Sequence, residues 1–170
     1  MKLNSKKLAL SGIMLALALI IGTIENLIPP MIPLLPFVKI GLSNVVITFS
    51  AITIGFVPTL IIVAFKSILV PIFIGNPMMI AYSLSASLVS LGIVFLMLKT
   101  KKVGIPTISI VSAITHTLVQ LSVASLIMES SLVFGFTPYL ILTGFLSGLI
   151  TGILTYLLVR FMPSEIILLD

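Results

Sequence analysis

Residues 103–128 read VGIPTISIVSAITHTLVQLSVASLIM, and this stretch decides how the rest of the chain is interpreted. It is apolar and long enough to cross a bilayer as a helix, since about 20 residues span the hydrocarbon core. Near its middle it carries His116, the only histidine, and Gln120 one turn later on the same helix face. A polar stripe inside lipid must face other protein or a water-filled cavity. We therefore expect the other spans to surround this face, which also holds Ser112, Ala113, Thr117 and Ala124.

The composition indicates an all-α integral membrane protein. Of 170 residues, 59% are hydrophobic and only 8% are charged, and the mean hydropathy is +1.39, whereas soluble domains carry about 25% charged residues. No stretch is polar and long enough to form a soluble domain, so residues 1–170 are expected to form a single transmembrane domain. The net charge of +5 comes from basic residues beside apolar segments, which favours lipid contact and orientation over nucleic-acid binding.

Six transmembrane helices are expected from the apolar segments. They cover about residues 8–28, 39–53, 59–74, 78–98, 103–128 and 139–161. Residues 29–39 contain four prolines and cannot form a regular helix. Because this segment is also apolar, we expect it to lie at the membrane surface or to fold over a cavity.

The distribution of charge predicts that both termini are cytoplasmic. Six spans place the termini on one side, and basic residues gather there, whereas the other side receives Glu25, Lys39 and Glu129. The excess of lysine and arginine marks the cytoplasmic side. The residues that carry this asymmetry are Lys2, Lys6, Lys7, Lys99, Lys101, Lys102 and Arg160.

No catalytic, metal-binding or cofactor motif is recognisable, so the chain is not expected to be an enzyme. It has one aspartate and three widely separated glutamates, no cysteine, no HExxH and no GxxxxGK[ST] phosphate loop. A lone histidine without a nearby carboxylate is a poor catalytic base and a poor metal site. Any ATP-driven work would come from a partner.

Lys66 is the most informative polar residue, since it lies near the middle of the apolar segment TLIIVAFKSILVPIF (residues 59–73). A lysine at a helix centre costs about 2.5–3.5 kcal/mol on membrane-insertion scales. Either Lys66 faces a cavity and attracts an anionic or electron-rich group of a ligand, or it forms a structural ion pair with Glu25 or Glu129 or extends to the interface. Both interpretations remain open.

Further polar residues converge on the outer half of the predicted bundle. His116 and Gln120 either contact a ligand or hydrogen-bond a neighbouring helix. By the predicted topology, the outer half also receives Glu25 and a set of candidate ligand-binding residues. We predict an outward-opening pocket capped by the proline-rich segment, with substrate-binding residues Lys39, Asn44, Lys66, Asn76, His116 and Gln120.

Small residues four apart mark two helix faces that permit close helix packing. In TGFLSGLITGIL (residues 143–154), the face formed by Gly144, Gly148 and Gly152 favours packing within the bundle. In the first span, Ala9, Gly12 and Ala16 form a comparable face. This face is expected either to pack internally or to dock another membrane subunit.

The chain resembles the Gx transporter family, also described as heptaprenyl diphosphate synthase component I. The resemblance covers about residues 8–160 and rests on KIGLSN after the proline-rich segment, IGNP at residues 74–77, YSLSASLVSL at 82–91, and the His116/Gln120 pair. The family is similar to the substrate-binding S components of energy-coupling factor (ECF) transporters. The resemblance implies a multi-pass protein of the bacterial plasma membrane that binds a small molecule from outside. Its partners would be a transmembrane coupling subunit and two cytoplasmic ATPases.

The same resemblance implies how such a protein would dock and bind. S components commonly dock through an AxxxA face on the first helix, for which Gly12 and Ala16 are the nearest match here. Their binding sites use the loop between the first two helices together with later helices. The synthase description fits less well, because the aspartate-rich magnesium motifs of prenyl diphosphate synthases are missing. An accessory subunit of a polyprenyl diphosphate synthase or of an electron-transfer assembly is the alternative function.

Overall fold

The computed structural model describes residues 5–28 and 41–162, and every regular element in these two ranges is helical. The all-α class expected from the sequence is therefore confirmed. The proline-rich segment and the predicted binding residue Lys39 lie outside the described residues. The elements are α1 (Ser5–Leu27), α2 (Ser43–Thr53), α3 (Phe56–Phe73), α4 (Met79–Thr100), α5 (Ile105–Ile127), the 3₁₀ helix η1 (Ser131–Phe136) and α6 (Thr137–Phe161).

Glycine and proline residues set most of the helix boundaries. Gly55 separates α2 from α3, and Gly75 lies in the turn that follows α3. Both α5 and α6 begin with a proline in their first turn, where the fixed φ angle suits the helix and the missing N–H is not needed. These positions explain why the spans expected from the sequence agree with the observed helices to within a few residues.

The prediction of six full spans is correct for five helices. α1, α3, α4, α5 and the η1–α6 segment are long and apolar enough to cross a membrane. α2 contains only 11 residues and is therefore about 16 Å long, roughly half of the hydrocarbon thickness of about 30 Å. The physical reason on the described side is Gly41, whose φ of 79° is a left-handed conformation through which a right-handed helix cannot continue toward its N-terminus.

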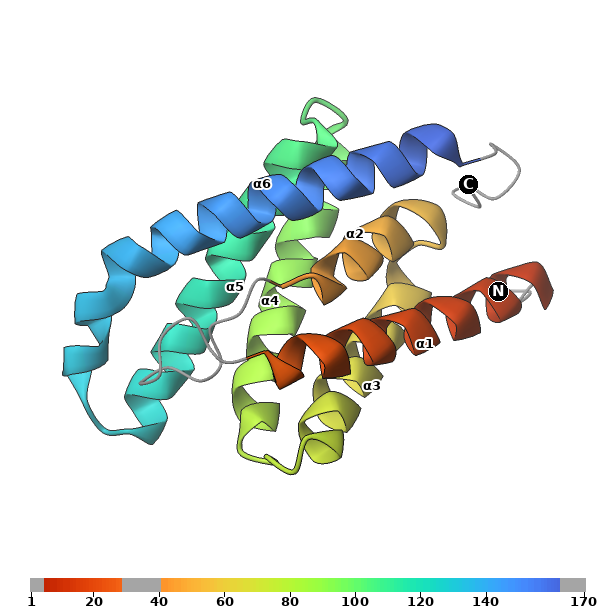
Figure 1. Cartoon of the computed structure of the whole chain (residues 1–170). Helices are drawn as coiled ribbons and strands as arrows, with labels where there is room; N and C mark the ends of the chain where they lie inside the picture. The colour runs from red at the N-terminus through yellow and green to blue at the C-terminus, as the bar shows by residue number, and fades with distance from the viewer. Residues whose placement is uncertain (1–4, 29–40, 163–170) are drawn as a thin grey trace.

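α2 is the central element of the bundle. Every residue from Val45 to Thr53 is buried, as is Ser43, because α1, α3, α4 and α6 all pack against this short helix. In Figure 1, the beginning of α1 and the end of α6 lie at the same end of the bundle, together with the connection from α2 to α3. The N-terminus of α2 therefore lies inside the molecule, near half depth.

α5 and α6 pack closely against each other, with backbones in contact along the glycine face of α6, while the C-terminal part of α6 passes over α2 (Figure 1). A Cβ atom on Gly148 would lie 2.6 Å from the Cα of Ile110, and one on Gly152 would lie 2.7 Å from the Cα of Pro106. Neither distance leaves space for a side chain. The small face of the last span therefore packs within the bundle, as the sequence favoured.

The small face of α1 has the opposite environment. Ala9, Gly12 and Ala16 are all exposed, and a Cβ atom on Gly12 would meet nothing within 4 Å. Large apolar side chains also cover much of the outer surface, including Phe65 and Phe145, as expected where helices contact lipid. The α1 face is thus available to lipid or to a partner.

Candidate ligand-binding site

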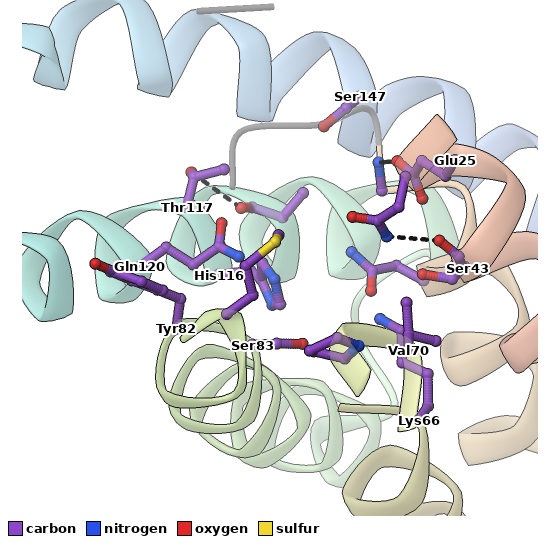
Figure 2. A pocket seen from close by; sticks show the side chains of 17 residues that line it. Glu25, Ser43, Lys66, Val70, Tyr82, Ser83, His116, Thr117, Gln120 and Ser147 are labelled. Carbon is purple, nitrogen blue, oxygen red and sulfur yellow. Dashed lines mark hydrogen bonds between the residues drawn. The ribbon is translucent and has the colours of Figure 1, made fainter. Parts of the chain in front are cut away.

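All six α-helices contribute side chains to a polar cavity in the bundle (Figure 2). The cavity measures about 80 Å³, and since one buried water needs about 10–15 Å³ by the same measure, it has room for several waters or part of a small polar molecule. Its lining residues are Gly22, Glu25, Asn26, Gly41, Ser43, Asn44, Lys66, Val70, Pro71, Met79, Tyr82, Ser83, Ala113, His116, Thr117, Gln120 and Ser147.

The cavity occupies the half of the bundle away from the chain ends. Glu25 lies in the last turn of α1, and Tyr82 lies in the first turn of α4. Lys66 is ten residues into α3, which places it about 15 Å along that helix. The cavity therefore extends from one end of the bundle to its middle, where the N-terminus of α2 meets it. The partial positive charge at a helix N-terminus favours electron-rich ligand groups.

Lys66 is buried in the cavity wall, and it has no close partner among the residues that the structure describes. Its side chain is 8% exposed, and within the described ranges no carboxylate oxygen lies within 4.0 Å of its Nζ and no acceptor hydrogen-bonds it. Glu25 is near enough to stabilise the ammonium charge electrostatically. An ammonium removed from water is costly unless it is solvated or paired. Lys66 is therefore available to a polar group that enters the cavity.

Two amide side chains add unused hydrogen-bonding capacity to the wall. Gln120 is 7% exposed, and Asn44 is half-buried at the start of α2. Among the residues that the structure describes, neither side-chain amide has a hydrogen-bond partner. Each amide offers two donors and one acceptor oxygen. Since both residues line the cavity, these groups are positioned to bind its contents.

His116 lies beside Lys66 but has partners of its own. Its Nδ1 lies 3.4 Å from the Ser90 hydroxyl of α4, and the backbone of Ala86 also interacts with the ring. Lys66 is close enough to act on it electrostatically. The neighbouring Thr117 hydroxyl bonds the carbonyl of Ile114 in its own helix at 2.9 Å. His116 thus connects α5 to α4 while one edge of the ring faces the cavity.

Glu25 brings a carboxylate from α1 to the same cavity. It is 5% exposed, and its Oε1 accepts a hydrogen bond from the backbone N–H of Gly41. Gly41 has a φ of 79°, a left-handed conformation that suits glycine, and this turn directs its N–H toward α1. The bond therefore joins the end of α1 to the start of α2, as Figure 2 shows.

The comparison with known protein families agrees with the sequence motifs. The sequence profile of the family described as heptaprenyl diphosphate synthase component I matches residues 14–158. The chain belongs to this family. A comparison with curated proteins found no match. The membrane-protein class and the family named from the sequence are thus established, and the profile covers the helices that form the cavity.

The structure of this family member brings together four of the six predicted binding residues. Asn44, Lys66, His116 and Gln120 all line the cavity. Asn76 does not, because it lies exposed in the turn between α3 and α4. Its backbone N–H bonds the carbonyl of Pro71 at 2.9 Å, closing the end of α3, so the helix-breaking IGNP sequence explains its presence.

Several cavity residues of this family member were not predicted. Glu25 was assigned to the outer half of the bundle but not to the binding set, and Tyr82, Ser83 and Ser147 were not singled out. Glu25 carried a usable signal, because an acidic residue near the end of an apolar span requires a buried partner or water. The hydroxyl residues carried none, since serines in membrane helices usually bond their own backbone.

Proposed function

We propose that this chain is the substrate-binding S component of an ECF-type importer in a bacterial plasma membrane. It captures a small organic molecule, such as a vitamin, cofactor or isoprenoid or quinone precursor, from the outer face. Lys66 and His116 attract an anionic or carbonyl-bearing group, while Asn44 and Gln120 hydrogen-bond the molecule. The proline-rich residues 29–38 act as the gate. Lys39 and Asn76 remain proposed contacts at the outer end.

One observation carries this proposal: a buried ammonium and a buried amide, Lys66 and Gln120, share a cavity without partners among the described residues. Buried polar groups in proteins are nearly always satisfied, and ionisable groups inside membrane bundles mark ligand or ion pathways. Interrupted helices whose N-termini meet a site near the bilayer midplane are a recurrent arrangement in transporters. α2 fits that arrangement.

The proposed role requires no catalysis by this chain. Within the described residues, no group of three His, Cys, Asp or Glu side chains is placed to hold a metal ion. Energy for release would come from the two cytoplasmic ATPase subunits, transmitted by a transmembrane coupling subunit. The cytoplasmic side is the one that carries Lys6, Lys7, Lys99 and Arg160, following the bias of basic residues.

The family description favours a second candidate function, a non-transporting membrane subunit of a polyprenyl diphosphate synthase. Affinity purification from gently solubilised membranes separates the two. An S component brings down a membrane coupling subunit and two ATPases, whereas an accessory subunit brings down a prenyl synthase subunit. Native mass spectrometry of the same sample identifies any retained small molecule. Recovery of the synthase without ATPases would refute the importer assignment.

The Gln120→Leu variant is expected to reduce ligand affinity about tenfold without unfolding the bundle. Leucine keeps a similar volume, and the amide has no described protein partner to lose, so only ligand bonds are removed, each contributing about 0.5–1.5 kcal/mol. Retention of the native ligand, measured by mass spectrometry after a fixed wash, reports the effect. Ser122→Ala, on the exposed side of α5, is the control. Full retention in Gln120→Leu would remove Gln120 from the site.

The Gly12→Leu variant is expected to fold normally but to lose its partner subunits. Leucine fits at Gly12 because no atom lies within 4 Å of its Cβ position, and leucine is a better helix former than glycine by about 0.5–1 kcal/mol. The enlarged side chain would however block close approach of a partner helix. Co-purification measures the loss, and ligand retention shows that the bundle is intact. Unchanged co-purification would place docking elsewhere.

A further inference from the structure

The cavity contains two opposite charges that are held apart. Lys66 contributes an ammonium from α3, and Glu25 contributes a carboxylate from α1. The Nζ atom of Lys66 and the carboxylate oxygens of Glu25 do not come within 4.0 Å of each other. The Lys66 side chain lies against α1, because its Cε is 3.6 Å from the position of a Cβ atom on Gly22, one turn before Glu25.

The carboxylate is fixed in place by the backbone rather than by the lysine. The Gly41 N–H donates to Glu25 Oε1, which uses one of about four acceptor positions on a carboxylate. Because Gly41 begins the turn into α2, this bond holds the carboxylate at the cavity wall. Among the described residues, the second oxygen and the Lys66 ammonium have no hydrogen-bond partner, so both are available to the cavity's contents.

The charge balance of the cavity limits what can replace its water. Without a ligand, the ammonium and the carboxylate would need water in the cavity to solvate them. A ligand that expels those waters must supply equivalent bonds, or the buried charge loses its solvation. A purely anionic ligand would satisfy Lys66 but repel Glu25, and a purely cationic ligand would do the reverse. A molecule carrying both signs satisfies the Lys66 ammonium and the Glu25 carboxylate together.

We propose that the ligand of this cavity is a small zwitterion, with its anionic group at Lys66 and the N-terminus of α2 and its cationic group at Glu25. The assignment rests on the proposed binding function and adds the chemical class of the ligand. Asn44 and Gln120 line the same cavity with amides that can donate and accept hydrogen bonds. A prenyl diphosphate is disfavoured, because several negative charges would face one described lysine and the Glu25 carboxylate.

Two matched sets of probes test the assignment on the full-length protein in lipid nanodiscs. They are 4-aminobutyrate with butyrate and butylamine, and 3-aminopropanoate with propionate and propylamine. Affinity is measured by titration calorimetry and by the shift in the thermal unfolding midpoint. In at least one set, the zwitterion is expected to bind at least tenfold more tightly than both singly charged analogues. Equal binding of a singly charged analogue, or no binding of either zwitterion, overturns the assignment.

The Glu25→Gln variant tests the carboxylate itself. Glutamine keeps a carbonyl oxygen that accepts from the Gly41 N–H, so the contact between α1 and α2 is preserved. The zwitterion is expected to lose at least tenfold in affinity, while the matched carboxylate binds as well as before or better. Glu129→Gln is the control, because it changes an exposed loop carboxylate outside the cavity. It should alter neither the zwitterion affinity nor the affinity of the matched carboxylate. An unchanged zwitterion affinity in Glu25→Gln overturns the assignment.

Failure of the ligand class is distinguishable from failure of the proposed function. If the coupling subunit and ATPases co-purify but butyrate binds as well as 4-aminobutyrate, the zwitterion assignment alone fails. If those subunits do not co-purify, the importer role fails, and the probe affinities still decide which ligand class the cavity accepts.

Discussion

Replacing Lys66 with methionine is expected to weaken ligand binding about 100-fold while leaving the empty protein at least as stable as the parent. Removing one partner of a buried charge pair costs about 2–5 kcal/mol of binding free energy, and 1.4 kcal/mol corresponds to tenfold. Stability changes in the other direction. A lysine at mid-membrane depth costs about 2.5–3.5 kcal/mol on insertion scales, and methionine removes that cost while retaining most of the side-chain volume.

The combination of the two effects identifies what Lys66 does. Ligand retention by mass spectrometry and the thermal unfolding midpoint of the ligand-free protein are measured on the same preparation. Lys99→Met, at the exposed end of α4, is the control and should change neither quantity. A lower midpoint with unchanged ligand retention would instead mean that Lys66 serves as a structural partner of Glu25, the alternative that the sequence left open.

The sequence predicts most of the helical architecture because hydropathy, glycine and proline act locally. The expected span at residues 103–128 corresponds to α5, Ile105–Ile127, and the expected span at 139–161 corresponds to α6, Thr137–Phe161. The local sequence pattern gave the wrong length for one helix, α2. α2 has an apolar sequence like the other spans, yet it is a half-length helix surrounded on all sides, and only the packing of four neighbours shows this.

Sequence reasoning finds the cavity residues whose side chains are too polar to face lipid. It misses those whose side chains are tolerated in a membrane helix or whose contacts are distant in the sequence. Lys66 and the His116/Gln120 pair are polar at mid-span, so their inward orientation follows from the bilayer alone. Asn76 was included because it lies in the outer half, but a turn asparagine has a local structural reason for being there. Glu25 was omitted because its bond to Gly41 joins residues 16 apart across the α1–α2 connection, a contact that no local pattern reports.

Replacing Gly148 with alanine is expected to lower the free energy of unfolding by about 1–3 kcal/mol, the usual cost of overpacking a tight interface. The added methyl group would lie 2.6 Å from the Cα of Ile110 and 2.9 Å from the carbonyl oxygen of Ser109. Both are backbone atoms, which cannot rotate away, so α5 and α6 must separate. α5 carries His116 and Gln120, and α6 carries Ser147 next to the substituted position. The same change is therefore expected to loosen the cavity and reduce ligand retention.

Gly92→Ala makes the same chemical change in a helix where nothing lies within 4 Å of the new methyl group. There, only helix propensity acts, and alanine should stabilise α4 by up to about 1 kcal/mol. The two variants should thus shift the unfolding midpoint, measured in the same detergent, in opposite directions. If the Gly148→Ala variant were as stable as the Gly92→Ala variant, this result would contradict the close contact between α5 and α6 at Gly148. The wall of the cavity formed by these two helices would then be wrong as well, because Ser147 and His116 depend on that contact for their positions.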